Sequence, residues 1–263
     1  MKDFNDKVAV VTGAASGIGK ALALDFAQRG MRVVLADIEQ GPLAQAGAEV
    51  GALGAEHLEL VCDVSRLADV QALADAAWRR FGKVHVLCNN AGVGMRGAIQ
   101  ALSLAQWQWV LGVNLWGVIH GVEAFVPRMI SQQEGGHVVN TASIAGLVAV
   151  AGLGPYQTSK FAVVGLSESL ARDLRPHGIG VSVLCPLGVD TNVWNSTRHL
   201  PDALRAHTQD IDRAQAAGTF RTPQEVSALV LRAIAAEQLY VFTHPEIGPL
   251  VDRRFEHIRA AYP

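Results

Sequence analysis

The stretch Val8-Ala9-Val10-Val11-Thr12-Gly13-Ala14-Ala15-Ser16-Gly17-Ile18-Gly19 decides the fold of this 263-residue chain. Its first five residues are almost all apolar and predict a strand that is buried on both faces. The glycines after the strand allow a tight turn, and the helical pattern that begins at Ile18 places backbone amides and a partial positive charge beside that turn. Such a strand–turn–helix unit favours a bound dinucleotide, held by Gly13, Ser16, Gly17, Ile18 and Gly19.

The same alternation of a short apolar strand and a longer helix recurs along the chain. Strands are expected at residues 8–12, 32–36, 58–62, 84–88, 137–141, 180–185 and 239–242. Helices are expected at residues 18–29, 41–54, 67–81, 104–131, 156–174 and 223–236, with Gly30, Gly82 and Gly178 at helix ends. Repeated β–α units build a parallel sheet covered by helices. We predict an α/β fold over residues 1–263: a single-domain doubly wound parallel sheet (Rossmann fold) of about seven strands, with helices on both faces.

Composition restricts the class of protein. Half of the residues are apolar, which is enough for one large core. The 22 basic and 24 acidic residues give a formal charge of −2 without a basic cluster, so we expect no nucleic-acid partner. No apolar run reaches about 18 residues and residues 1–7 lack a signal-peptide core, so we expect no membrane association and a cytoplasmic location. Cys62, Cys88 and Cys185 fit buried free thiols, and no metal site is expected.

Asp37 stands at the end of the second expected strand. A carboxylate at that point can accept hydrogen bonds from the adenine ribose and repel a 2′-phosphate. Ile38 stands where an arginine could hold such a phosphate, and Ser16 stands in the turn where a basic residue could do the same. We therefore expect NAD in preference to NADP, although Lys20 and Arg32 lie nearby in the sequence.

Tyr156 and Lys160 lie four residues apart in an expected helix, so the phenol and the ammonium share one face, and Ser143 precedes them. A phenol with a pKa of about 10 is a poor base at neutral pH. A cation about 5 Å away favours the phenolate by roughly 3 kcal/mol, which equals about two pKa units. We expect Lys160 to lower the pKa of Tyr156 and the pair to act in acid–base catalysis. The pair is also common on helix surfaces, so it does not decide the function alone.

Two segments depart from the β–α alternation. Residues 192–221 follow the sixth strand with mixed aromatic, apolar and charged side chains, and ligands of parallel sheets bind beyond such strand ends. We expect a substrate lid there, with a plain surface loop as the alternative. Residues 249–261 form a C-terminal helical tail with Val251, Phe255 and Ile258 on one side, able to cover its own pocket or to dock on a neighbour.

Taken in order, these motifs resemble those of the classical short-chain dehydrogenases/reductases (SDRs), an NAD(P)-dependent family, over essentially the whole chain. The shared residues are Thr12-Gly-x-x-x-Gly17-x-Gly19, Asp63, Asn89-Asn90-Ala91-Gly92, Asn114, Ser143, Tyr156 and Lys160. The resemblance implies adenine contacts from Asp63 and the backbone of Val64. It also implies that the chain runs beside the cofactor ribose at Asn90, Ala91 and Gly92.

The resemblance also implies the catalytic roles. Ser143 would hydrogen-bond the reacting oxygen and Tyr156 would exchange its proton. Lys160 would bind the nicotinamide ribose and favour the phenolate, while Asn114 would bend its helix and hold a water that links Lys160 to solvent. After the sixth strand the family usually has Pro-Gly, whereas this chain has Pro186-Leu187. Cofactor contacts are still implied for Pro186, Val189 and Thr191, the last two at the nicotinamide carboxamide.

The residues expected around the reacting carbon are nearly all apolar: Ser143, Met95, Ala145, Val150, Leu153 and Trp194, with Gly94, the rest of 149–153 and Val189 beside them. This lining favours a hydrophobic secondary alcohol or ketone, either aryl, alicyclic or steroid-like. The alternative within the family is an NADPH-dependent 3-oxoacyl-thioester reductase, and the alternative from another class is a non-catalytic dinucleotide-binding protein. Since members of the family are commonly homotetramers, we expect a homotetramer, with a homodimer as the alternative.

Overall fold

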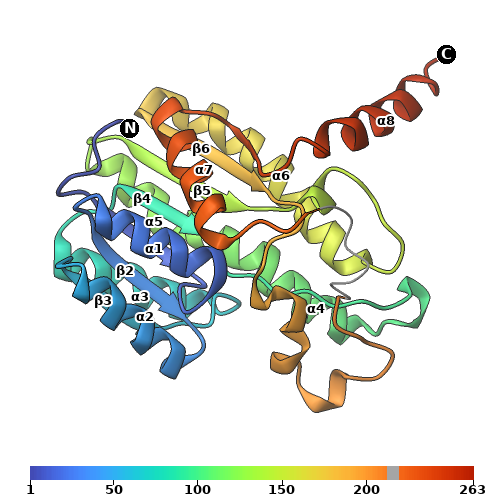
Figure 1. The fold of residues 1–263 in the computed structure, drawn as a ribbon, viewed down its shortest axis with the longest axis horizontal. Coiled ribbons are helices and arrows are strands. Elements are labelled where there is room, and N and C mark those ends of the chain that lie inside the picture. Colours follow the sequence, from blue (N-terminus) through green and yellow to red (C-terminus); the bar gives the residue numbers. More distant parts are fainter. Residues whose placement is uncertain (212–218) are drawn as a thin grey trace.

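A seven-stranded sheet forms the centre of the computed structural model, which describes residues 1–211 and 219–263 (Figure 1). The strands are β1 (Val8–Thr12), β2 (Arg32–Asp37), β3 (His57–Val61), β4 (Val86–Asn89), β5 (Gly136–Thr141), β6 (Ile179–Cys185) and β7 (Tyr240–Phe242). Every neighbouring pair is parallel, in the order β3-β2-β1-β4-β5-β6-β7. The predicted doubly wound parallel sheet is confirmed.

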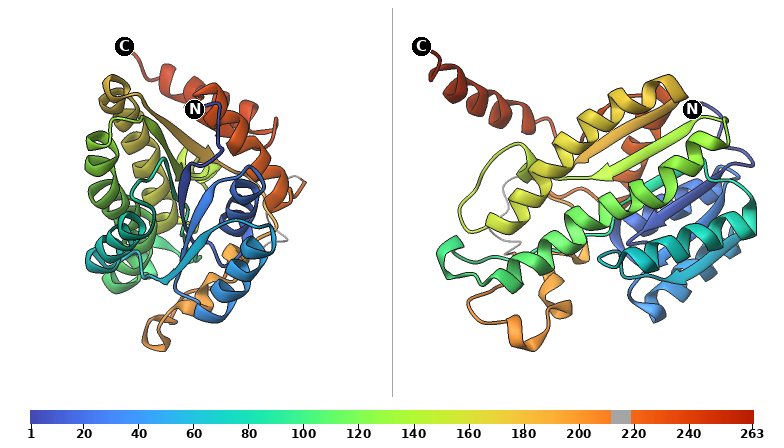
Figure 2. Two further views of the ribbon diagram at one scale, coloured as in Figure 1. Left: turned by 90° about the vertical axis from the view of Figure 1, so that its left-hand side faces the viewer. Right: turned by 180° about the vertical axis from the view of Figure 1, so that it is seen from behind.

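Helices cover both faces of this sheet, as Figures 1 and 2 show. On one face α1 (Gly17–Gln28), α2 (Gln40–Ala52) and α7 (Pro223–Ala236) enclose one apolar core with the strands. On the other face α3 (Leu67–Phe81), α5 (Gly117–Ser131) and α6 (Gly154–Leu174) enclose a second. Because each central strand is covered twice, β1 is buried at all five of its residues, which explains its unbroken apolar sequence.

Element boundaries lie within two residues of the predicted ones for every strand. The fourth strand begins at Val86, two residues late, because its ladder with β1 starts there. Gly30, Gly82 and Gly178 have φ angles of 76°, 74° and 66°, which confirms them as left-handed helix ends.

The predicted helix 104–131 is divided. It consists of α4 (Leu104–Leu111), a π-helical turn at Gly112–Trp116 that contains the buried Asn114, and α5. By length and composition alone this run could cross a membrane, whereas no such run was expected from the sequence. Of its most apolar window, 44% is buried inside the protein. Core helices pass the same test, and this run packs on α3 and α6.

The chain leaves the alternation after β6. Two short 3₁₀ helices, Asn192–His199 and Asp202–Leu204, fall in the expected lid, while residues 212–218 of it lie outside the described residues. The tail forms α8 (Ile247–Arg259), which projects from the body of the molecule in Figure 1 and in the right-hand view of Figure 2. In α8 only Ile247 is buried. The three cysteines are buried free thiols, as expected.

Candidate active site

A cavity of about 810 Å³ lies at the carboxyl ends of the strands. Residues that follow β1 to β6 line it, and so do residues of the segment after β6. The strand order reverses between β1 and β4, and open parallel sheets bind ligands at this switch point. The fold therefore gathers the candidate residues from distant parts of the sequence into one site.

The turn between β1 and α1 forms one end of the cavity. Gly13 and Gly17 have φ angles of 66° and 54°, in the left-handed region that glycine tolerates. Ser16, Gly17 and Ile18 line the cavity, and in the described part of the chain the Ser16 side chain caps none of the first amides of α1. Amides left open at a helix N-terminus are suited to a pyrophosphate.

Gly19 lies behind the cavity lining, and its assignment as a cofactor contact stays a prediction. A Cβ added at Gly19 would lie 2.0 Å from the Gly13 carbonyl oxygen and 2.6 Å from Nδ2 of Asn90. Gly19 is thus required because α1 packs directly on the turn behind the cradle.

Two strand-end carboxylates continue the lining from the cradle. Asp37 lies at the end of β2 and accepts hydrogen bonds of 3.0 Å from the amides of Ala15 and Glu39, so its carboxylate is fixed at the cavity wall. Asp63, after β3, accepts hydrogen bonds from the amide and hydroxyl of Ser65, and Val64 lines the cavity beside it. These positions suit an adenosine whose pyrophosphate lies on α1.

The segment after β4 passes closely over the cradle. Asn90 donates through Nδ2 to the Thr12 carbonyl at 3.0 Å and accepts at Oδ1 from the Thr141 hydroxyl at 3.2 Å. Its side chain therefore joins the ends of β1, β4 and β5. Ala91 and Gly92 follow it along the cavity wall. Within the site Asn90 holds the strand ends together, and small neighbours leave room for a ligand.

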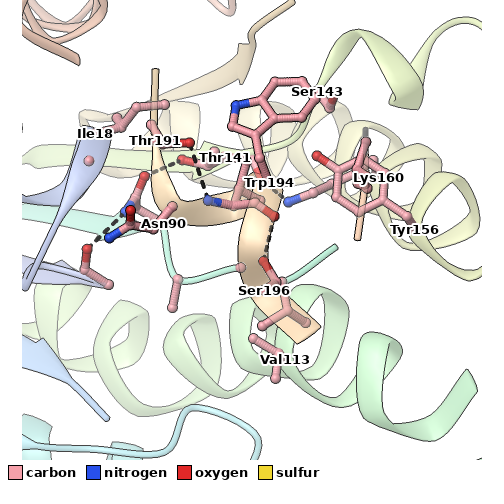
Figure 3. Close-up of a pocket in the computed structure, with 18 of the residues that line it drawn as sticks. Ile18, Asn90, Val113, Thr141, Ser143, Tyr156, Lys160, Thr191, Trp194 and Ser196 are labelled. Carbon is pink, nitrogen blue, oxygen red and sulfur yellow. Dashed lines mark hydrogen bonds between the residues drawn. The ribbon is translucent and has the colours of Figure 1, made fainter. Parts of the chain in front are cut away.

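Ser143, Tyr156 and Lys160 meet at the other end of the cavity, opposite Ile18, Asn90 and Thr191 (Figure 3). Ser143 follows β5 and hydrogen-bonds Tyr156, which lies in the first turn of α6. The Lys160 ammonium lies 5.6 Å from the centroid of the Tyr156 ring and donates to the Thr141 carbonyl at 2.8 Å. The helix spacing of four brings phenol and ammonium to one face, as the sequence indicates.

The pKa of Tyr156 is raised above its ordinary value because the phenol is buried, and the hydrogen bond to Ser143 only partly opposes this. The expectation that Lys160 lowers this pKa is wrong for the protein without ligand. Burial also lowers the pKa of Lys160 to about 8, which still leaves the ammonium mostly charged at neutral pH. At both groups desolvation by burial is the largest cause of the pKa change.

Asn114 lies in the π-helical turn and is fully buried outside the cavity lining. Its side-chain oxygen accepts from the Val93 amide at 2.8 Å, and Nδ2 donates to the Val93 carbonyl and to the Ser159 hydroxyl. Asn114 thus fixes the segment after β4 against α6. Its predicted role, which is to hold a water that links Lys160 to solvent, stays a prediction.

The segment after β6 forms one wall of the cavity. Pro186, Val189 and Thr191 line the cavity, as does Leu187 in place of the usual glycine. Trp194 donates from its indole nitrogen to the Val189 carbonyl at 2.7 Å, which ties the lid to the strand end.

The wall near Ser143 is mostly apolar. Ala145, Val150, Leu153 and Trp194 line the cavity there, as proposed from the sequence. Met95 does not line the cavity, which corrects its assignment to substrate binding: its side chain is fully buried in the protein. Arg96, the next residue, lines the cavity instead.

A family model for short chain dehydrogenases matches residues 7–201, which include every cofactor and catalytic position described above. The chain belongs to the short-chain dehydrogenase family. It is accordingly an oxidoreductase by class.

The similarity to other short-chain dehydrogenases extends over the whole chain. A family member from Burkholderia phymatum, crystallised in complex with NAD, is 44% identical with a TM-score of 0.93, covering 100% of this chain and 98% of that one. The CLA biosynthesis dehydrogenase/reductase of Lactiplantibacillus plantarum is 33% identical over 98% of this chain and 95% of that protein. The 1-deoxy-11-beta-hydroxypentalenate dehydrogenase of Streptomyces avermitilis is 38% identical over 95% of this chain and 89% of that protein.

Several residues of this short-chain dehydrogenase enter the site without having been foreseen. Thr141 accepts the hydrogen bond of Lys160, and Glu39, Arg198 and Leu250 line the cavity. The position of Thr141 at the end of an expected strand could have indicated a place in the site, because ligands bind at such strand ends. Glu39 carries the same signal, since it follows β2 closely. Arg198 and Leu250 belong to the expected lid and tail, but spacing does not show which residue of each segment reaches the cavity.

Proposed function

We propose that this protein transfers a hydride between NAD(H) and a hydrophobic secondary alcohol or ketone, with Tyr156 as the general acid and base. The observation that carries the proposal is the convergence of Ser143, Tyr156 and Lys160 on the apolar end of a cavity whose other end is a pyrophosphate cradle. The similar Burkholderia phymatum protein was crystallised with NAD, which supports the same cofactor here.

The nicotinamide ring, when bound, accepts the hydride in oxidation and supplies it in reduction. In oxidation Ser143 donates a hydrogen bond to the substrate oxygen and Tyr156, as phenolate, takes the hydroxyl proton. In reduction Tyr156 returns that proton to the oxygen. Lys160 holds the ribose and favours the phenolate by its charge. The positive charge that NAD would bring to the site would add to that of Lys160 and oppose the burial that raises the pKa of Tyr156 in the free protein.

The substrate class follows from the apolar wall around Ser143. Such a wall binds a carbon skeleton and offers few partners to the hydroxyl groups of a sugar. The relative from Streptomyces avermitilis is named for the dehydrogenation of a hydroxylated pentalenate. We therefore propose an aryl, alicyclic or steroid-like alcohol or ketone as the substrate.

A panel of secondary alcohols and ketones tests this function, with NAD(H) and NADP(H) and absorbance of the reduced nicotinamide as the readout. Aryl and alicyclic compounds are expected to turn over with NAD(H), and polyols are not. Turnover of 3-oxoacyl thioesters with NADPH alone would favour the alternative reductase. Cofactor binding without turnover of any compound would favour a non-catalytic protein.

Asp37 is expected to set the preference for NAD. Its carboxylate is fixed at the cavity wall, where it would repel a 2′-phosphate. Asp37→Asn removes this charge, and we expect kcat/KM with NADP to rise about tenfold relative to NAD, a change of about 1.4 kcal/mol. Steady-state kinetics with both cofactors measure the ratio. Asp75→Asn, which removes a carboxylate paired with Arg128 on another surface, is the control. An unchanged ratio in the Asp37 variant would assign the preference to other residues.

Assembly and location stay predictions. We propose a homotetramer, with a homodimer as the alternative, in the cytoplasm. Light scattering coupled to size exclusion measures the mass of the assembly directly.

A further inference from the structure

The lid and the cofactor end of the cavity are joined by an ion pair between residues 159 positions apart. Nη2 of Arg198, in the 3₁₀ helix Asn192–His199, donates to Oε2 of Glu39 at 3.0 Å. Nε2 of His199 lies 3.6 Å from the same oxygen. Glu39, Arg198 and His199 all line the cavity, so the contact lies at its border.

Arg198 is held in place for this contact by its own segment. Its Nη1 donates to the carbonyl oxygens of Asn192 and Asn195 at 3.1 and 2.8 Å. Thr197, the preceding residue, is fixed from the other side, because its amide and hydroxyl both donate to Oδ1 of Asp210. An arginine whose fork is already oriented loses less side-chain freedom when it binds a carboxylate. The guanidinium is therefore oriented toward Glu39 by its own segment, unlike that of a freely moving surface arginine.

Glu39 is connected just as directly to the cofactor end. Its amide donates to Oδ1 of Asp37 at 3.0 Å, and the other oxygen of Asp37 holds the amide of Ala15 in the cradle. Hydrogen bonds therefore connect Arg198 of the lid to Glu39, Glu39 to Asp37, and Asp37 to the cradle. Among the described residues, Glu39 thus pairs with Arg198 and His199 of the lid at the N-terminus of α2, beside the end of β2.

We propose that Glu39 and Arg198 form a latch that fastens residues 192–199 of the lid over the adenosine end of the cleft, so that the opening of this segment limits the release of NADH. The inference rests on the proposed function, in which this end holds the adenosine of NAD(H). Glu39 and Arg198 are then positioning residues: they keep the lid closed and take no part in proton or hydride transfer. His199 also lies at the latch, since its Nε2 is 3.6 Å from the same carboxylate oxygen.

The test uses Glu39→Gln and Arg198→Gln, with stopped-flow fluorescence of NADH displacement. Both variants are expected to release NADH about fivefold faster, the scale of one partly exposed, charge-assisted contact. If the two side chains acted on NADH only through their charges, the two variants would differ. Loss of the carboxylate would slow the release of the anionic dinucleotide, and loss of the guanidinium would speed it. Opposite changes in the two variants would therefore overturn the latch.

The double variant provides a second criterion. Since both substitutions break one contact, Glu39→Gln with Arg198→Gln is expected to release NADH no faster than either single variant. Rates that multiply in the double variant would show two independent effects and contradict the proposal. Arg198→Lys retains the charge and is expected to recover part of the loss. Arg205→Gln, which breaks an exposed pair with Asp202 elsewhere in the lid, is the control and should leave release unchanged.

Hydrogen exchange of the free protein gives a readout independent of the cofactor. The amides of residues 192–199 are expected to exchange about fivefold faster in Glu39→Gln and Arg198→Gln than in the wild type, because opening is easier. Equal exchange would refute the latch even if NADH release changed. A wild-type protein that binds no NADH would instead refute the proposed function, while the exchange measurement would still judge the latch.

Discussion

Replacing Tyr156 by Phe is expected to lower kcat by about a thousandfold, in the range that general acid–base catalysis contributes. The substitution removes one oxygen atom, the group that hydrogen-bonds Ser143 and faces the reacting end of the cavity. The ring stays, so packing in the first turn of α6 is preserved. NADH binding, measured by fluorescence titration, is expected to stay within about twofold of the wild type because only chemistry is affected.

The dependence on pH distinguishes a lost base from a disturbed site. Oxidation requires the phenolate, so kcat/KM for the alcohol rises with pH as Tyr156 ionises. Burial raises the pKa of Tyr156 in the free protein, and the positive charge of bound NAD would oppose this effect, so the rise is expected below the pKa of the free protein. The residual activity of Tyr156→Phe is expected to lack the rise. Tyr262→Phe, at an exposed tyrosine, is the control. Full activity in Tyr156→Phe would eliminate the proposed mechanism.

The fold was predictable because its determinants are local. The apolar run of β1 and the glycine turn after it define a strand, a turn and a helix without reference to any other part of the chain. Repetition of that unit leaves few arrangements, since parallel crossovers follow one hand. The division of helix 104–131 was less accessible, because the π-helical turn forms where Asn114 meets Val93 and Ser159, both distant in sequence.

The site was predictable in its membership and less so in its energetics. The motifs placed Ser143, Tyr156 and Lys160 together, but the sign of the pKa change at Tyr156 depends on burial, which spacing does not reveal. Met95 was misplaced because neighbouring residues of a turn face opposite sides, and Arg96 takes the cavity side. The contact of Arg198 with Glu39 could not be inferred, since it depends on the path of an irregular segment.

Gly19→Ala is expected to weaken NADH binding about a hundredfold and to lower the free energy of unfolding by about 2 kcal/mol, as overpacking does. The added Cβ would lie 2.0 Å from the carbonyl oxygen of Gly13 and 2.6 Å from Nδ2 of Asn90. The first obstacle is backbone, which cannot rotate away as a flexible side chain can. Either α1 or the turn must move, and both form the cradle. Fluorescence titration with NADH and denaturant unfolding measure the two effects.

Gly165→Ala supplies the matched control within helix α6. A Cβ at Gly165 meets nothing within 4 Å, so this substitution is expected to stabilise the protein by up to about 1 kcal/mol through helix propensity, with NADH binding unchanged. The pair separates the general effect of alanine from the local clash, because the two substitutions add the same methyl group to a helix. If Gly19→Ala bound NADH as tightly as the wild type, the cofactor would not depend on the close packing of α1 against the turn. The pyrophosphate would then have to be held elsewhere in the cavity.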